Sequence, residues 1–203
     1  RELSPHDLEP ATRILRTASD LSMLARSLHL KHKRFVDHFP ETTVVQDGIA
    51  EAEDALRRIA LTLRTHGAGL VPHKERALAD SVIGVGEDLA SIIVSEIGDP
   101  LRFKSGKQLV AYAGLDPKVK QSGASLAHNT AITKRGSPYL RRAFFIAASV
   151  AQRYDPDLKA YYEKKRAEGK AYSPATIANA RHIAHRVLAV LKRGTPYVKR
   201  ELV

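Results

Sequence analysis

The first third of the chain carries apolar residues at alternating spacings of three and four, which is the spacing of a heptad seam. Only His32 breaks the first seam, which consists of Ala11, Ile14, Ala18, Leu21, Ala25, Leu28, Phe35 and Phe39. After Pro40 and a Thr-Thr pair, a second seam follows at Val45, Ile49, Ala52, Leu56, Ile59 and Leu63 and ends near Gly67 and Gly69. The spacing predicts two long helices, and we assign residues 1–69 to a coiled-coil and oligomerisation domain.

Many seam positions are alanine, so the apolar stripe is thin and a partner helix is needed to cover it. Two arrangements satisfy this need. The two helices can fold on each other as an antiparallel hairpin, or they can pair with the helices of another subunit.

Residues 70–203 have a different sequence pattern, which predicts short helices separated by glycine and proline turns. Ser137-Pro138, Asp155-Pro156 and Ser173-Pro174 each place a capping residue before a proline at the first helical position. Ser105 with Gln108 three residues later is typical of a capping box. Strand signals are almost absent. The predicted fold class is mainly α, a coiled-coil helical pair followed by a compact helical domain.

The charge of the chain is concentrated in its second part. The net charge is +11, yet residues 1–80 hold 12 basic and 12 acidic residues, so residues 81–203 carry the whole surplus. A basic region of this kind predicts a polyanionic partner such as nucleic acid, and a solvated basic face is the alternative. The absence of cysteine excludes disulfides and a thiol nucleophile. We find no membrane span or signal peptide, so we expect no membrane partner and a cytoplasmic location.

A glycine turn, Gly84-Val85-Gly86, lies between a helix that ends near Asp80 and one predicted over residues 87–97. Two glycines let a backbone approach a phosphate, and the following helix offers free N–H groups, so residues 75–97 indicate a helix-hairpin-helix-like motif. Glu87 and Asp88 would repel a phosphate at that helix start. A purely structural turn is therefore the alternative.

The loop at residues 118–136 is polar, basic and glycine-dotted. Ser122 precedes a glycine among four cations and no acid, an arrangement that suits a serine nucleophile attacking a phosphodiester. Spacing alone does not distinguish this serine from an ordinary loop serine, and Ser125 is a second candidate.

Several further residues are candidates for contact with nucleic acid. Arg141 and Arg142 begin a helix, where cations oppose the helix dipole, so their placement suggests a role other than stability. His182 and His185 have the spacing of a metal pair but no carboxylate nearby in sequence, and we predict no metal site in this chain. The full set of nucleic-acid candidates is Gly84, Gly86, Lys104, Lys107, Lys118, Lys120, Gln121, Lys134, Arg135, Arg141 and Arg142.

A series of short motifs within residues 75–198 resembles a known family. The series is Arg102-Phe103, Gln108 to Pro117 (QLVAYAGLDP), Gln121-Ser122-Gly123, Ile132 to Gly136 (ITKRG), Leu140-Arg141-Arg142, the YDPDL run at Tyr154, Tyr161 and Gly169-Lys170. It is similar to the C-terminal transposase domain of the DEDD-type insertion-sequence transposases. These are bridge-RNA-guided recombinases, to which Piv-type DNA invertases are related. Ile83 departs from the family, which usually has proline in the glycine turn.

The resemblance implies that a serine of this domain, at the position of Ser122, attacks DNA and becomes linked to a 5′ phosphate. It implies DNA and a structured guide RNA as partners, a dimer or tetramer, and a nucleoid-associated prokaryotic protein. The family's Mg²⁺ is held by four acids in an N-terminal nuclease domain that nothing in these 203 residues resembles. We therefore expect the C-terminal part of a longer transposase, with no cofactor bound in this chain. The alternative is a non-enzymatic DNA-binding and oligomerisation module.

Overall fold

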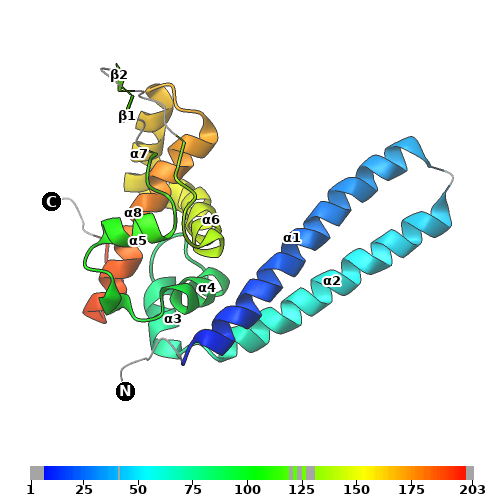
Figure 1. The fold of residues 1–203 in the computed structure, drawn as a ribbon, viewed down its shortest axis with the longest axis horizontal. Coiled ribbons are helices and arrows are strands. Elements are labelled where there is room, and N and C mark those ends of the chain that lie inside the picture. The colour runs from blue at the N-terminus through cyan, green and yellow to red at the C-terminus, as the bar shows by residue number, and fades with distance from the viewer. Residues whose placement is uncertain (1–6, 41, 119–120, 123–124, 127–130, 200–203) are drawn as a thin grey trace. The chain divides into compact units, whose positions relative to one another are not determined.

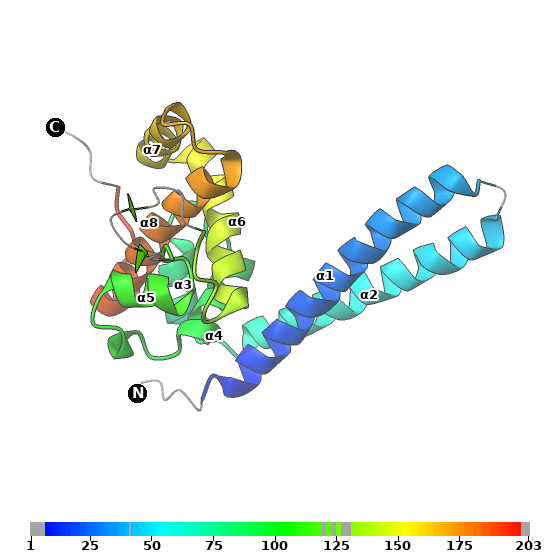
Figure 2. The same cartoon turned by 45° about the horizontal axis from the view of Figure 1, so that its top comes forward.

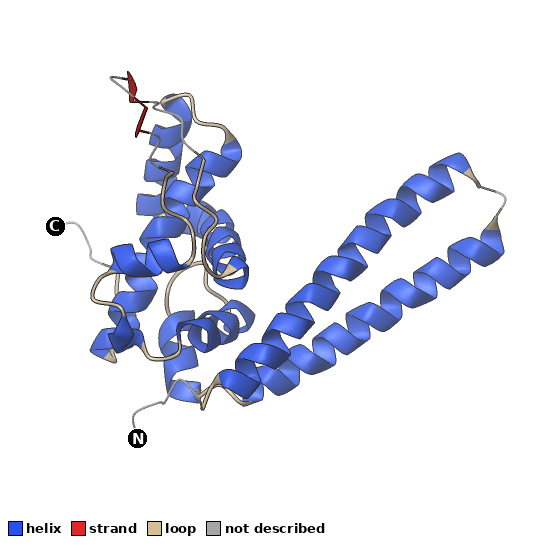
Figure 3. Cartoon of the chain, viewed as in Figure 1, coloured by secondary structure: helices blue, strands red, loops and turns tan. Residues whose placement is uncertain are grey.

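The computed structural model describes residues 7–40, 42–118, 121–122, 125–126 and 131–199. Within them the chain is mainly helical, as predicted (Figure 3). None of the described helices is long and apolar enough to cross a membrane. In chain order the elements are α1 (Glu9–His38), α2 (Thr43–Gly69), α3 (His73–Asp80), α4 (Glu87–Ile97), the 3-10 turn η1 (Pro100–Arg102), α5 (Gly106–Tyr112), β1 (Gln121–Ser122), β2 (Ser125–Leu126), α6 (Pro138–Tyr154), α7 (Pro156–Ala167) and α8 (Tyr172–Arg193).

The chain divides into two compact units, and the division falls between Val71 and Pro72. We call the first the hairpin unit and the second the helical unit. In the hairpin unit α1 and α2 run antiparallel and pack along their length (Figure 1). The two long helices predicted by the heptad spacing are confirmed, and within the described chain they cover each other.

The buried seam of the hairpin differs from the predicted seam. Its fully buried members are mostly small: Leu8, Ala11, Leu15, Ala18 and Ala25 on one side, and Glu53, Ala60 and Gly67 on the other. A Cβ atom on Gly67 would lie 2.9 Å from Cγ of Leu15, so the helices touch closely at this level. Small residues occupy the seam because the two backbones approach each other.

Most of the predicted seam lies outside the buried one, because only Ala11, Ala18 and Ala25 of its fourteen positions are buried. Ile14, Leu21, Leu28 and Phe35 are half-buried beside it, while Val45 and Ile59 are 49% and 51% exposed. The prediction was wrong at these positions because a heptad series contains two neighbouring rows, and their spacing does not show which row the partner helix covers.

In the helical unit, α8 is the central element and packs against α3, α5, α6 and α7. Helices α6 and α8 lie side by side in both Figures 1 and 2. Fully buried apolar side chains fill the space between the helices, among them Leu109, Leu115, Leu140, Phe144, Ile183 and Val187. This core gives the residues around α5, α6 and α8 a rigid support.

Two of the predicted helix starts are confirmed in detail. The Ser137 hydroxyl accepts a hydrogen bond from Leu140 N–H (3.1 Å), and the Asp155 carboxylate accepts from Asp157 N–H (2.9 Å) and Leu158 N–H (3.2 Å). Asp155 is fully buried and also pairs with Arg186 of α8. One residue therefore begins α7 and fastens it to the central helix.

Two other capping predictions were wrong. Helix α8 begins after Ala171, ahead of Ser173, and has no side-chain cap. Ser105 does precede α5, but its side chain makes no capping bond, and Gln108 Oε1 accepts from Lys104 N–H instead. Both helices are held by packing against neighbouring helices, which reduces the need for a local cap.

Candidate nucleic-acid interface

The segment predicted as an irregular loop begins and ends in two paired extended stretches, residues 114–118 and 131–135, which we call the stalk. The pairing consists of Lys118 N–H to Ala131 O (2.8 Å), Thr133 N–H to Asp116 O (2.9 Å), Lys134 N–H to Gly114 O (3.1 Å) and an antiparallel bridge between Pro117 and Ile132. Further along, β1 and β2 also pair antiparallel. The segment predicted as a loop thus contains two short antiparallel pairings.

Two glycines allow the stalk to close at its base. Gly114 has φ +65°, and a Cβ there would lie 2.3 Å from the carbonyl oxygen of Arg135. Gly136 has φ +100°, and a Cβ there would lie 2.0 Å from the carbonyl oxygen of Tyr112. Both positions require a residue without a side chain. These glycines were a signal in the sequence for a close backbone approach.

Ser122 and Ser125, the two nucleophile candidates, are Cα partners in the β1–β2 register. The backbone thus brings both serines to one short antiparallel pair. In Figure 1 this pair lies at the end of the helical unit remote from α3. The side chains of Gln121, Ser122 and Ser125, and the whole of Lys120 and Gly123, fall outside the part of the chain that the structure describes.

The stalk carries exposed cations. Lys118, Lys134 and Arg135 are all exposed, and Lys134 adopts φ +55°, which is unusual for a residue other than glycine. Asp116, the one acid of the stalk, accepts a hydrogen bond from the Thr133 hydroxyl (2.6 Å). The three cations therefore give this surface a positive charge that suits phosphate.

Arg141 and Arg142 are less exposed to solvent than the cations of the stalk. Both are half-buried, and the Arg141 guanidinium donates to the carbonyl of Ala113 (3.1 Å), so it ties the start of α6 to the end of α5. This bond supplies a structural reason for a cation at a helix start, which the sequence argument had not foreseen.

Lys104, just before α5, and Lys107, in its first turn, are both exposed, and α8 packs against α5. Gly106 faces His185 so closely that a Cβ on the glycine would lie 2.3 Å from Nδ1 of the histidine. Lys192 donates to the carbonyl of Phe103. The same helix reaches the stalk, because Arg181 Nε donates to Leu115 O (2.9 Å).

Sequence reasoning missed these supporting residues of α8. Arg181 and Lys192 stand 66 and 89 residues from their partners, and no local pattern reports such pairs. Helix α8 thus connects the stalk to the Lys104–Lys107 surface.

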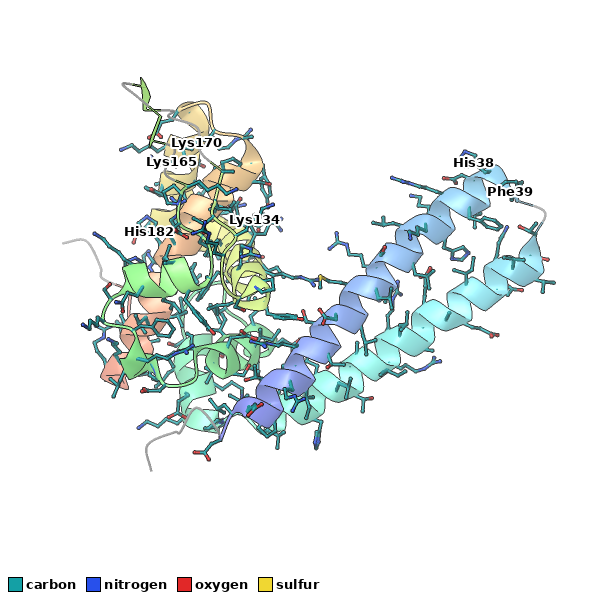
Figure 4. The ribbon with its side chains drawn as sticks, viewed as in Figure 1. His38, Phe39, Lys134, Lys165, Lys170 and His182 are labelled. Atoms are coloured by element: carbon teal, nitrogen blue, oxygen red, sulfur yellow. The ribbon has the colours of Figure 1, made fainter. Side chains whose placement is uncertain are left out.

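His182 packs edge-on against the ring of Tyr161, with centroids 4.6 Å apart, and Lys165 lies over the same ring. Figure 4 labels His182 and Lys165 in the helical unit. Burial lowers the pKa of His182, and the positive charges of Arg186, His185 and Arg181 lower it further. Among the described residues no group of three His, Cys, Asp or Glu side chains is arranged to hold a metal ion.

The two glycines of the glycine turn, Gly84 and Gly86, have different surroundings. A Cβ on Gly84, which has φ +94°, would lie 2.3 Å from the carbonyl oxygen of Ala147 in α6, so this glycine serves close packing. Gly86 faces open space at the start of α4. Glu87 flanks it and pairs with Arg76 (3.5 Å). Of the two glycines, Gly86 is the one whose backbone a phosphate can approach.

Residues 76–163, from α3 to α7, match the family model described as Transposase IS116/IS110/IS902 family. By this match, residues 76–163 are similar to a domain of this transposase family. The matched range contains the glycine turn, the stalk, Ser122 and the start of α6. The hairpin unit and α8 lie outside the matched range.

The chain is also similar to several named proteins over part of its length. The chain is 34% identical over 131 residues to the insertion element IS110 uncharacterized 43.6 kDa protein of Streptomyces coelicolor, an alignment that covers 64% of this chain and 32% of that protein. It is 32% identical over 130 residues to the pilin gene-inverting protein of Moraxella bovis, covering 63% and 40%. It is 32% identical over 126 residues to the insertion element IS900 uncharacterized 42 kDa protein of Mycobacterium paratuberculosis, covering 62% and 31%. The chain thus spans between a third and two fifths of the length of these relatives.

Proposed function

We propose that this chain is the part of a DNA transposase or recombinase that binds DNA and supplies Ser122 as the nucleophile for strand cleavage and exchange. The observation that carries the proposal is the place of Ser122 in β1, beyond a stalk with three exposed cations and within the matched transposase domain. Lys118 precedes Ser122 by four residues, which a chain covers in at most about 14 Å. Phosphates of one DNA strand lie within reach of both.

In the proposed reaction, Ser122 Oγ attacks the phosphorus of a DNA phosphodiester. The Oγ–P bond forms as the P–O3′ bond breaks, so the serine is linked to a 5′ phosphate and the other strand end leaves as a 3′ hydroxyl. The serine proton passes to a base, and the leaving oxygen takes up a proton. Cations such as Lys118, Lys134 and Arg135 stabilise negative charge on the phosphate oxygens and position the strand. Gly86, Lys104 and Lys107 hold neighbouring phosphates.

Two partners belong to the proposal. A structured guide RNA is the second nucleic acid, and the basic surface beside α5 and α8 offers it phosphate contacts. A second copy of the chain pairs through the hairpin unit. Its support is the row of half-buried apolar residues Ile14, Leu21, Leu28 and Phe35 beside the covered seam, with exposed Val45 and Ile59 on α2.

The test is to trap the covalent intermediate with the natural full-length protein, Mg²⁺ and the RNA that copurifies with it. DNA labelled at the 3′ end should migrate with the protein on a denaturing gel, while DNA labelled at the 5′ end should not. Ser122→Ala should abolish the adduct, and the matched variant Ser125→Ala should retain it. An adduct that persists in Ser122→Ala refutes the nucleophile. Salt-sensitive DNA binding without any adduct identifies a non-enzymatic binding module.

A further inference from the structure

The hairpin unit contains a cavity of about 290 Å³ that opens between its two helices. Four of its lining side chains are arginine or histidine, and none is a carboxylate. We call it the arginine pocket, and its lining residues are Ser22, Ala25, Arg26 and His29 from α1 with Arg57, Ala60, Leu61 and Arg64 from α2.

Small residues create the pocket. Ala25 and Ala60 are each 2% exposed and belong to the buried seam, so they form its base. The long arginine side chains stand around this base, and Leu61, which is 62% exposed, stands at its rim. The cavity therefore follows from the alanine-rich seam, which leaves space where larger seam residues would fill it.

Two of the arginines are held in place by neighbours. The guanidinium of Arg64 donates to the Ser22 hydroxyl (3.0 Å), and that of Arg57 donates to the Glu53 carboxylate (3.4 Å). Glu53 also accepts from His29 Nδ1 (3.0 Å) and His32 Nδ1 (3.2 Å). One carboxylate is thus shared by three donors, and Asp54 lies 4.0 Å from the Arg57 guanidinium, so these acids offset part of the positive charge beside the pocket.

Arg26, on α1, is the third arginine of the pocket. Among the residues that the structure describes, it has no hydrogen bond or ion pair, and its side chain is exposed at the pocket. Residues 1–80 have no net charge, yet three arginines and no carboxylate line this pocket. Glu53 and Asp54 lie beside Arg57, and the excess of arginine in the lining is concealed by a total over the segment.

The chemistry of the pocket favours phosphate. A guanidinium presents a planar fork of donors that matches two phosphate oxygens. The volume lies just below the roughly 300–1,000 Å³ of sites that enclose whole small molecules, so the pocket suits a group that projects from a larger ligand. Arg57 and Arg64 are seven residues apart, about 10 Å along the helix. Three successive phosphate-to-phosphate steps of one strand rise about that length along the axis of a duplex.

We propose that the arginine pocket binds phosphates of a nucleic-acid backbone, so that the hairpin unit is itself a nucleic-acid contact surface. This inference rests on the proposed nucleic-acid-binding function of the chain. It assigns a site to the unit whose sequence carries no net charge and which the transposase family model does not cover.

The first test measures binding of the full chain to a DNA duplex and to an RNA duplex of equal length over a series of salt concentrations. The double variant Arg26→Gln/Arg64→Gln should lower the slope of log Kobs against log salt by about 1.8 for DNA, which corresponds to two phosphate contacts. The matched control Arg13→Gln/Arg58→Gln removes the same charge from exposed positions of the same helices outside the pocket, and it should change the slope far less. Equal slopes for the two variants overturn the proposal.

A second measurement does not depend on the stability of the variants. A photo-crosslinking amino acid is placed at Leu61, on the rim, or at Leu30, which is 55% exposed and outside the pocket. Crosslinks to nucleic acid should form from position 61 and be absent from position 30. The reverse pattern, or equal yields, overturns the proposal.

The two duplexes identify the source of the phosphate. An effect restricted to RNA assigns the pocket to an RNA partner, and one restricted to DNA assigns it to the substrate. If the chain binds a duplex but the pocket variant binds as the control does, this inference is refuted and the proposed function stands. If the unaltered chain binds neither duplex, both proposals are refuted.

Discussion

A Cβ atom on Gly114 would lie 2.3 Å from the carbonyl oxygen of Arg135, so the base of the stalk closes only because residue 114 has no side chain. Gly114→Ala should therefore destabilise the helical unit. The left-handed backbone costs on the order of 1–3 kcal/mol for alanine, and the clash adds to this cost. Denaturant unfolding of the full chain measures the loss.

Gly169→Ala is the matched control, because Gly169 also has a positive φ, +83°, but faces open space. It should suffer the backbone strain alone and lose less stability than Gly114→Ala. Equal losses for the two variants would show that the close approach at Arg135 contributes nothing.

The elements that could be predicted from sequence are those set by local signals. Ser137 and Asp155 cap helices through hydrogen bonds to residues two or three positions away, so a short motif suffices to locate them. The seam of the hairpin was predicted only in small part, because heptad spacing identifies the helices but not which of two adjacent rows is covered. Glu53 is buried in that seam, and its burial depends on histidines more than 20 residues away.

The stalk escaped prediction for a similar reason. Its two segments pair across more than a dozen residues, and they lack the alternation of apolar and polar residues that reveals a half-buried strand. The support from Arg181 and His185 arises only when α8 packs on the stalk and on α5. Candidate site residues could thus be named from motifs, while the contacts that position them required the fold.

Substitutions of the two glycines in the glycine turn should distinguish a packing role from a role in phosphate contact. Gly84→Ala should destabilise the helical unit, because its Cβ would lie 2.3 Å from the Ala147 carbonyl oxygen. Gly86→Ala should leave the unfolding midpoint nearly unchanged, since φ is −84° and nothing lies near the added Cβ. We expect it to weaken DNA binding by on the order of 1 kcal/mol, the worth of one hydrogen bond. Unfolding and DNA titrations of both variants provide the measurement, and unchanged affinity in Gly86→Ala would assign the turn to structure alone.

The buried pair of Asp155 and Arg186 should be important for stability. Asp155 is fully buried, and its removal leaves the Arg186 guanidinium without its ion-pair partner and α7 without its cap. Asp155→Ala should cost about 3–5 kcal/mol, the usual loss when one partner of a buried pair is removed. Asp157→Ala, at an exposed site in the first turn of the same helix, should cost far less. Similar unfolding free energies for the two variants would contradict the assignment.

Glu53 makes the stability of the hairpin unit sensitive to acid. Burial raises the pKa of this carboxyl group, but hydrogen bonds and charge from His29 and His32 outweigh burial, and the folded pKa lies below the ordinary value of 4.5. Above pH 4.5 the group is ionised in both states, and its contacts stabilise the fold. As the pH falls below 4.5 the unfolded chain takes up the proton first, so stability declines until the pH has passed the folded pKa.

Because the chain has no cysteine, dyes attached through Leu24→Cys and Ile59→Cys can report on the hairpin alone. The urea midpoint of this signal should fall between about pH 5 and pH 3 in the otherwise unaltered chain. Glu53→Gln should lower the midpoint at neutral pH and remove most of this acid dependence, since the amide has no proton to gain in that range. Asp54→Asn, which alters an exposed neighbour on the same helix, should preserve the dependence. If Glu53→Gln responds to acid as the unaltered chain does, the cluster of Glu53 with its two histidines is not the source of the effect.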